Sequence, residues 1–351
     1  MTSWTGRSYL LHGVARRELI HRRTIVLGIA LLLVASAGPV FGHHFTDAFA
    51  RWSSGRDHLA VICLVALQQL LAPVHEGFHL LLGLGLAYAL IDRLRAVRLL
   101  QRTLSSLPWT SPLAGDPFSR AAALAGVNPL QVRLVHGLPA PAFTTGWFRP
   151  VIYVAAELQT RLSQRELAAV LAHEGAHVAR RDPLRLCLVR FLARTLFWLP
   201  AVQQLAEDFC DEAEVEADDA AATLALPSGP LVLASALVTT AATFTVVSER
   251  SLQGHHVAGF CTSSLQSDLL GRRVRRLAGE IAPVRSHLTR RGIAVAVATL
   301  GLVWASSLAV AQSASIGEPA LHCSHESGWA LAHLFCGRYH DAHDAPCMHD
   351  A

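Results

Sequence analysis

Charged residues are scarce in this sequence. Asp, Glu, Lys and Arg make up only 16% of its 351 residues, whereas 52% are hydrophobic. A soluble protein of this length normally carries more charge, so the composition favours a membrane protein with at least one soluble domain. The net charge of +4 is too weak and too scattered to indicate nucleic-acid binding, so we expect no direct nucleic-acid partner.

Paired cysteines with CxxC spacing are also missing. Four of the seven cysteines lie in apolar or helical contexts and are expected to be buried thiols: Cys63, Cys187, Cys210 and Cys261. The other three, Cys323, Cys336 and Cys347, lie in a polar, histidine-rich tail. Two interpretations of this tail stay open: a site for a soft or borderline metal ion, or a disordered tail with one disulfide and a free thiol.

Long apolar stretches, by contrast, are present at 24–42, 58–91 and 292–312. The first follows four arginines and no clear cleavage site comes after it, which predicts a retained span with a cytoplasmic N-terminus. The second contains Pro73 and several polar residues, and it is too long for one straight span and short for two. The third is preceded by arginines, which predicts that the chain leaves the cytoplasm there.

The sequence therefore predicts five parts. They are a cytoplasmic segment (1–23), an N-terminal transmembrane region of two or three spans (24–92), a cytoplasmic globular domain (93–291), a C-terminal transmembrane helix (292–312) and an extracytoplasmic tail (313–351). Residues 229–248 are uncharged and long enough to span, but a buried helix of the globular domain is the favoured interpretation.

Two HExxH motifs occur, HEGFH at His75–His79 and HEGAH at His173–His177. On a helix this spacing places two imidazoles on one face, where they can bind zinc, and the glutamate between them can act as a base. A catalytic zinc site also needs a third protein ligand and an open position for water. The third ligand therefore decides which motif is the better candidate.

The surroundings of the second motif supply that ligand. Ser163 and Glu166 predict a capping box at the start of its helix, which is expected to end at Asp182. A second helix and the turn at Pro200 return the chain as a third helix. There an ExxAD pattern offers Glu214 as the third zinc ligand, and Asp218 can accept a hydrogen bond from a ligating imidazole. The alternative is that Glu214 belongs to a solvated acidic helix face.

The first motif has no such support. No ExxAD segment follows His79 at short range, and Glu76 lies among apolar residues where an unpaired carboxylate is costly. The N-x-x-P segment with an Asp-Gly ligand that accompanies HExxH in intramembrane metalloproteases is absent. We therefore interpret residues 75–79 as a polar cluster with coincidental spacing, and its role stays open.

Residues 130–225 resemble the BlaR/MecR-type antirepressor metallopeptidases, bacterial membrane proteins with a zinc protease domain between spans. The shared features are the HExxH helix, Asp182, a Phe-Trp-x-Pro stretch at 197–200, Glu214 with Asp218, and two strand-like segments at 139–143 and 149–154. The best-known members end in a penicillin-binding domain with an S-x-x-K serine. That motif is absent after the last predicted span, so sensing of β-lactams is not expected.

The resemblance implies a mostly α-helical membrane protein with a small β-sheet, an α+β zincin-like metalloprotease domain inserted between transmembrane helices. It implies Zn²⁺ held by His173, His177 and Glu214, with Glu174 as the catalytic base. A multi-pass protein of the bacterial cytoplasmic membrane would then cleave a cytoplasmic protein, for which we predict a transcriptional repressor. The alternatives are a quality-control protease of the membrane and a non-catalytic sensor or scaffold.

Two further expectations concern substrate and charge. Residues 148–155 alternate and are β-branched, which favours an edge strand that pairs with an extended peptide substrate. The sequence does not decide which group stabilises the oxyanion, and the candidates are two histidines and four arginines. A basic, solvated helix explains the four arginines equally well. The candidates are His255, His256, Arg272, Arg273, Arg275 and Arg276.

Overall fold

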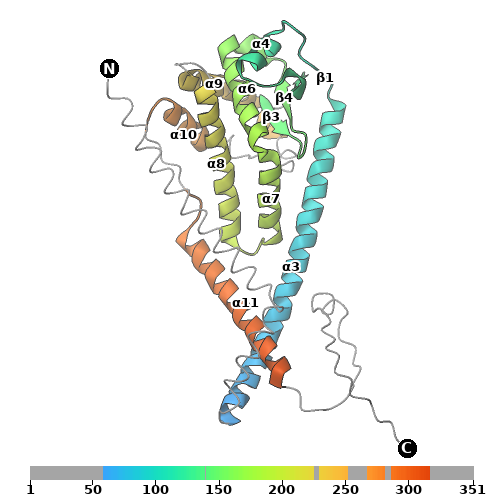
Figure 1. The fold of residues 1–351 in the computed structure, drawn as a ribbon, viewed down its shortest axis with the longest axis vertical. Helices are drawn as coiled ribbons and strands as arrows, with labels where there is room; N and C mark the ends of the chain where they lie inside the picture. Colours follow the sequence, from blue (N-terminus) through green and yellow to red (C-terminus); the bar gives the residue numbers. More distant parts are fainter. Residues whose placement is uncertain (1–57, 139, 225–228, 252–266, 281–285, 317–351) are drawn as a thin grey trace, which may run out of the picture. The chain divides into compact units, whose positions relative to one another are not determined.

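The computed structural model describes residues 58–138, 140–224, 229–251, 267–280 and 286–316. These residues are mostly helical and include one mixed sheet of four strands (Figure 1), so the predicted combination of helices with a small sheet is confirmed. The chain divides into two compact units, one made of residues 81–296 and the other of the flanking segments. The larger unit contains the second HExxH motif.

The sheet has the strand order β1-β2-β4-β3, and its strands are β1 (Trp109–Thr110), β2 (Val132–Val135), β3 (Ala142–Thr145) and β4 (Val151–Ala155). β4 pairs in parallel with β2 and antiparallel with β3. The prediction that 148–155 forms an edge strand is therefore wrong. Residues 152–155 are all buried, as an inner strand requires, and β3 is the edge strand.

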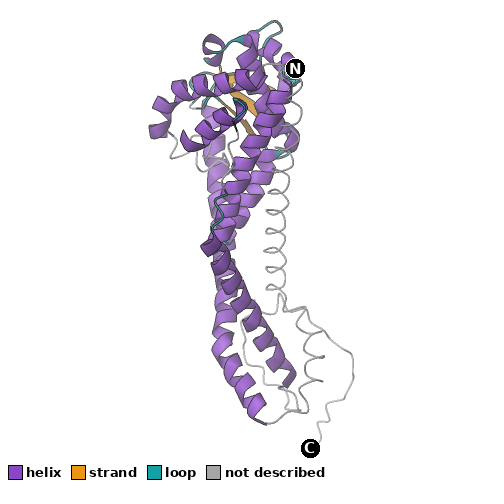
Figure 2. Cartoon of the chain, turned by 90° about the vertical axis from the view of Figure 1, so that its left-hand side faces the viewer, coloured by secondary structure: helices purple, strands orange, loops and turns teal. Residues whose placement is uncertain are grey.

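Helices surround this sheet (Figure 2). α4 (Pro117–Leu124), α6 (Gln164–Arg180) and α9 (Gly229–Ser251) share one apolar core with β2 and β4. Phe118, Leu171 and Leu233 are fully buried in it. The packing of α9 confirms that residues 229–248 form a helix of the globular domain. Two short helices, η1 (Pro129–Gln131) and α5 (Leu158–Arg161), lie on either side of the β2–β4 segment in the sequence.

Three consecutive helices form the part that carries the motif residues. α6 begins with the predicted capping box, in which the side chains of Ser163 and Glu166 each accept a hydrogen bond from the other residue's backbone N–H. Arg181, the residue after α6, has a left-handed conformation (φ 54°, ψ 39°), and α7 (Asp182–Thr195) starts at once. α8 (Pro200–Leu224) then returns beside α6 and α7 (Figure 1), followed by α9 and α10 (Ser267–Leu277). The predicted three-helix arrangement is confirmed.

The predicted spans can be compared with α3 (His58–Ser106) and α11 (Arg290–Ile316). α3 is a single helix of 49 residues that continues through Pro73 without a break, so the stretch 58–91 is part of one helix. Within the described ranges, none of the helices combines the length and the apolar character that a membrane crossing requires. The predicted span at 24–42 and the tail beyond residue 316 lie outside the described residues.

In the smaller unit, the first HExxH motif lies on α3. Its His75 Nδ1 is 3.2 Å from Ser307 Oγ of α11, and His79 Nδ1 is 2.9 Å from the His75 carbonyl oxygen. Glu76 is exposed. Among the described residues, no carboxylate completes a metal-binding group with these two imidazoles. The interpretation as a polar cluster agrees with this arrangement.

Gly85 of α3 marks a close approach between helices in the larger unit. A Cβ atom built there would lie 2.0 Å from the carbonyl oxygen of Thr195, at the end of α7. We expect Gly85→Ala to force the backbones apart and to lower the free energy of unfolding by about 1–3 kcal/mol. Gly83→Ala is the control, since its Cβ would meet nothing within 4 Å and alanine favours helix. Equal melting temperatures for the two variants would contradict this prediction.

Candidate metal centre

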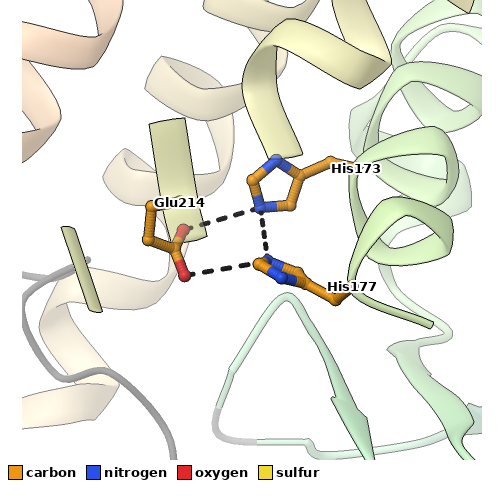
Figure 3. Close-up of side chains that lie close together, drawn as sticks. All are labelled: His173, His177 and Glu214. Atoms are coloured by element: carbon orange, nitrogen blue, oxygen red, sulfur yellow. Dashed lines mark hydrogen bonds and ion pairs between the residues drawn. The ribbon is translucent and has the colours of Figure 1, made fainter. Parts of the chain in front are cut away.

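The HEGAH helix and α8 bring three ligand-type side chains together. His173 and His177 lie one turn apart on α6, and Glu214 on α8 faces both (Figure 3). Glu214 Oε2 is 3.5 Å from His173 Nε2, and Oε1 is 3.8 Å from His177 Nε2. The ligand atoms of the three residues all lie within 4.8 Å of one another, and the two histidines are buried. The interpretation of Glu214 as part of a solvated face is therefore wrong.

Each imidazole has its own carboxylate on the side away from this cluster. His177 Nδ1 is 2.8 Å from Asp182 Oδ2, and His173 Nδ1 is 3.0 Å from Asp218 Oδ1. Both carboxylates are almost fully buried. A carboxylate at Nδ1 favours a proton on that nitrogen, which leaves the lone pair of Nε2 directed toward the cluster.

The resulting arrangement fits a cation. The two Nε2 atoms are 3.2 Å apart, a distance that a shared proton bridges and that a bound metal ion would also span. An ion that binds imidazole nitrogens at about 2.0–2.1 Å with tetrahedral geometry spaces two such nitrogens about 3.3 Å apart. The donor set of two imidazoles and one carboxylate therefore matches a three-ligand metal centre.

The charges in the cluster are strongly coupled. Burial by itself lowers the pKa of His173, but its contacts with Asp218 and Glu214 raise that pKa to about 9. Burial raises the pKa of Glu214, and the Arg273 guanidinium together with the two imidazoles outweighs burial and holds that pKa well below its usual range. The carboxylate of Glu214 is thus ionised, and a metal bound at the His173 Nε2 atom would displace a proton.

Asp182 also connects the α6–α7 turn to α8. Its Oδ2 accepts hydrogen bonds from His177 and from Arg180 Nε and Nη2, and these partners outweigh burial and lower the pKa of Asp182. Arg180 Nη2 donates in addition to the Ala213 carbonyl oxygen, directly before Glu214. The left-handed Arg181 makes the turn tight enough to place Asp182 under His177. The role of Asp182 was not assigned from the sequence.

Glu174, the glutamate of the motif, points toward the sheet. It is buried, and its Oε2 accepts a 2.8 Å hydrogen bond from Thr144 Oγ1 on the edge strand β3. The same hydroxyl lies 3.2 Å from the Glu174 carbonyl oxygen. The edge strand therefore holds the carboxylate that is the candidate base, a contact that the sequence did not indicate.

Arg273 of α10 is the main charged group that sequence reasoning left undecided. Its side chain is only 3% exposed and contacts both Glu214 and Asp218. The interpretation of this residue as part of a solvated helix is therefore wrong. A signal existed, because Leu269, Arg273 and Leu277 are spaced by four residues and so share one helix face. His255 and His256 lie in the part of the chain that the structure does not describe.

One protein-family model matches a large part of the chain, including the metal centre. Residues 80–250 match the family described as BlaR1 peptidase M56. The chain is similar to this family over just under half of its length. The match contains His173, Glu174, His177 and Glu214, and it begins one residue after the first HExxH motif ends. The expected resemblance is confirmed, and similarity to a metallopeptidase family implies a metal cofactor and a protein substrate.

Curated proteins that match part of the chain are proteases. The chain is 34% identical over 98 residues to the protease HtpX of Chromohalobacter salexigens, which covers 27% of this chain and 33% of the relative. It is 37% identical over 91 residues to the protease HtpX homolog 2 of Methanosarcina mazei, covering 25% and 31%. The matched region thus spans about a third of the length of these relatives. No solved structure matches the chain.

Proposed function

We propose that the chain is a zinc-dependent endopeptidase of the bacterial cytoplasmic membrane, in which His173, His177 and Glu214 hold the zinc ion. The convergence of these three side chains beside a buried Glu174 is the observation that carries the proposal. We further propose that the M56 domain is cytoplasmic and that it cleaves a cytoplasmic protein, a transcriptional repressor, in a response to a signal. The membrane attachment rests on the arginine-flanked apolar stretches at 24–42 and 292–312.

The residues of the site have separate roles in this reaction. Bound zinc would supply a Lewis acid for the scissile carbonyl and lower the pKa of a water molecule. Asp182 and Asp218 favour a proton on the two Nδ1 atoms, so that both Nε2 atoms would be available as metal ligands. Glu174 takes a proton from the attacking water and passes it to the leaving amine. Thr144 fixes the direction of the Glu174 carboxylate.

The edge strand β3 is the proposed docking place for the substrate backbone. Among the described strands β3 pairs only with β4, so its other edge lies on the side away from β4, and Thr144 of this strand contacts the candidate base. An extended peptide that pairs with β3 would pass beside Glu174. Proline substitutions in β3 remove backbone donors, and unchanged KM values in such variants would exclude this docking mode.

The substrate class is tested by co-expression. Where a neighbouring gene encodes a small winged-helix repressor, that protein is the first candidate, and immunoblotting of cells with the wild-type chain is expected to show a shortened repressor. The repressor should stay intact with the Glu174→Gln chain. Persistence of the full-length repressor with active wild-type chain, as judged by cleavage of an unfolded model protein, would exclude the repressor as substrate.

The similarity to proteases HtpX favours a second candidate, a quality-control protease of the membrane. Such an enzyme would cleave several unrelated unfolded membrane proteins at comparable rates, whereas a dedicated antirepressor would prefer one folded partner. A non-catalytic sensor or scaffold is disfavoured because the base Glu174 is present and held in place.

Thr144→Val tests the contact between β3 and the base. A hydrogen bond to a charged group contributes about 1.5–3 kcal/mol, so we expect kcat/KM to fall by roughly 10–100-fold. Thr144→Ser keeps the hydroxyl and should restore most of the activity. Thr145→Val changes the next residue, on the opposite face of the strand, and is the matched control. Equal kcat/KM values for Thr144→Val and Thr145→Val would contradict the assigned role.

A further inference from the structure

Helix α10 presents a buried arginine to the metal centre. Leu269, Arg273 and Leu277 are 2%, 4% and 8% exposed, so the arginine takes a core position between two leucines. A buried guanidinium is costly unless it is paired and hydrogen-bonded. The partners of Arg273 therefore explain why it occupies this position. α10 packs beside α8 and α9 (Figure 1) and lies beyond the segment that matches the M56 family.

Arg273 divides its donors between two carboxylates of α8. Its Nε and Nη2 atoms each lie 2.7 Å from one oxygen of Asp218, a bidentate pair, and Nη1 lies 2.9 Å from Glu214 Oε2. Asp218 Oδ1, which accepts from Nη2, is also the oxygen next to His173 Nδ1. One side chain thus contacts a proposed zinc ligand and the partner of another ligand.

This contact resolves an electrostatic conflict on α8. Glu214 and Asp218 are four residues apart, and like charges with this spacing repel each other on a helix. Asp218 is buried and the Glu214 side chain is only 13% exposed, so water screens the repulsion poorly. Without a cation between them, one carboxylate would take up a proton or turn away. The planar guanidinium neutralises both and fixes their directions at once.

We propose that Arg273 is a positioning residue of the metal centre: it holds Glu214 and Asp218 in the geometry that binds the metal. This inference rests on the proposed function, in which Glu214 and His173 are zinc ligands. Arg273 binds Glu214 through Oε2 and not through Oε1. Helix α10 is therefore a part of the metal centre and extends it beyond the HExxH and ExxAD helices.

The same helix offers a matched comparison. Arg276 also pairs with an α8 carboxylate, with Nη2 2.7 Å from Asp219 Oδ2, but the Asp219 side chain is 57% exposed, whereas those of Glu214 and Asp218 are 13% and 4% exposed. Arg276→Gln thus removes an α8–α10 ion pair of the same length without touching the metal centre. Arg273→Gln removes the pairs at Glu214 and Asp218.

Zinc affinity of the purified full-length chain, measured by competition with a chromogenic chelator, tests the proposal. We expect Arg273→Gln to raise the zinc dissociation constant by about 10–100-fold, the range typical of partners that orient metal ligands. Arg273→Lys should give a partial loss, because an ammonium cannot reproduce the bidentate fork. Arg276→Gln should bind zinc like the wild type.

Two further measurements separate positioning from general stabilisation. Zinc raises the melting temperature of a protein by an amount set by its affinity, so Arg273→Gln should shrink the difference between zinc and EDTA. A merely structural role would lower both melting temperatures equally and keep that difference. The visible absorption of the Co²⁺-substituted protein should also change in Arg273→Gln, because the band reports the ligand geometry.

The failures of the two proposals can be told apart. A wild-type chain that binds no zinc would refute the proposed metal centre itself. Wild-type binding that depends on Glu214, together with unchanged or tighter binding in Arg273→Gln, would overturn the role of Arg273. If Arg273→Gln does not fold, Arg273→Lys decides the question, and wild-type affinity and an unchanged cobalt spectrum in that variant would overturn it.

Discussion

Replacement of Glu174 by glutamine is expected to lower kcat/KM for a peptide substrate by about 10²–10⁴-fold while zinc stays bound. Loss of a positioned general base has an effect of this size. The amide keeps the shape of the side chain and can still contact Thr144, so the fold should be unaffected. Cleavage of a quenched fluorescent peptide and zinc content should be measured on the same preparation.

The chain contains its own control for this experiment. Glu76 occupies the same place in HEGFH as Glu174 does in HEGAH. It is exposed, whereas Glu174 is buried and bonded to Thr144. Glu76→Gln should leave kcat/KM unchanged. Activity that survives Glu174→Gln but not Glu76→Gln would move the active site to the first motif and refute the assignment made here.

The contrast between the two motifs explains why the three metal-ligand candidates could be predicted from the sequence. Spacing alone does not separate HEGFH from HEGAH, since both place two imidazoles one turn apart. The ExxAD pattern two helices downstream made the distinction, because a helix hairpin returns Glu214 to the same place. The structure brings these side chains together as expected. Local helix geometry and short connections were sufficient for this part of the prediction.

Contacts that depend on distant segments were missed. Arg273 lies 59 residues after Glu214 in a helix with four arginines, and such a pattern is equally typical of a solvated face. Only its position between Leu269 and Leu277 indicated burial. The edge of the sheet was assigned to the wrong strand for a related reason. Alternating apolar residues predict a strand, but they do not show which strands pair with it. β4 lies between β2 and β3, which come from other segments of the chain.

Glu214 is the residue whose loss should change metal binding most. Glu214→Gln removes the proposed carboxylate ligand and leaves Arg273 without one of its two partners. We expect the zinc dissociation constant to rise by more than the roughly 10–100-fold that is typical when an orienting partner is removed. Asp218→Asn should fall within that range, since it weakens only the contact with His173 Nδ1 and the pair with Arg273.

Asp219→Asn completes this series as a control, because Asp219 is adjacent to Asp218 but is exposed and pairs with Arg276 at the surface. Its zinc affinity should equal that of the wild type. The order of effects, Glu214 above Asp218 and Asp218 above Asp219, follows from their contacts: Glu214 lies next to both Nε2 atoms, Asp218 next to His173 Nδ1, and Asp219 next to Arg276. Wild-type zinc affinity in Glu214→Gln would show that α8 provides no ligand, and the metal centre would then have to be built around α6 with a different third residue.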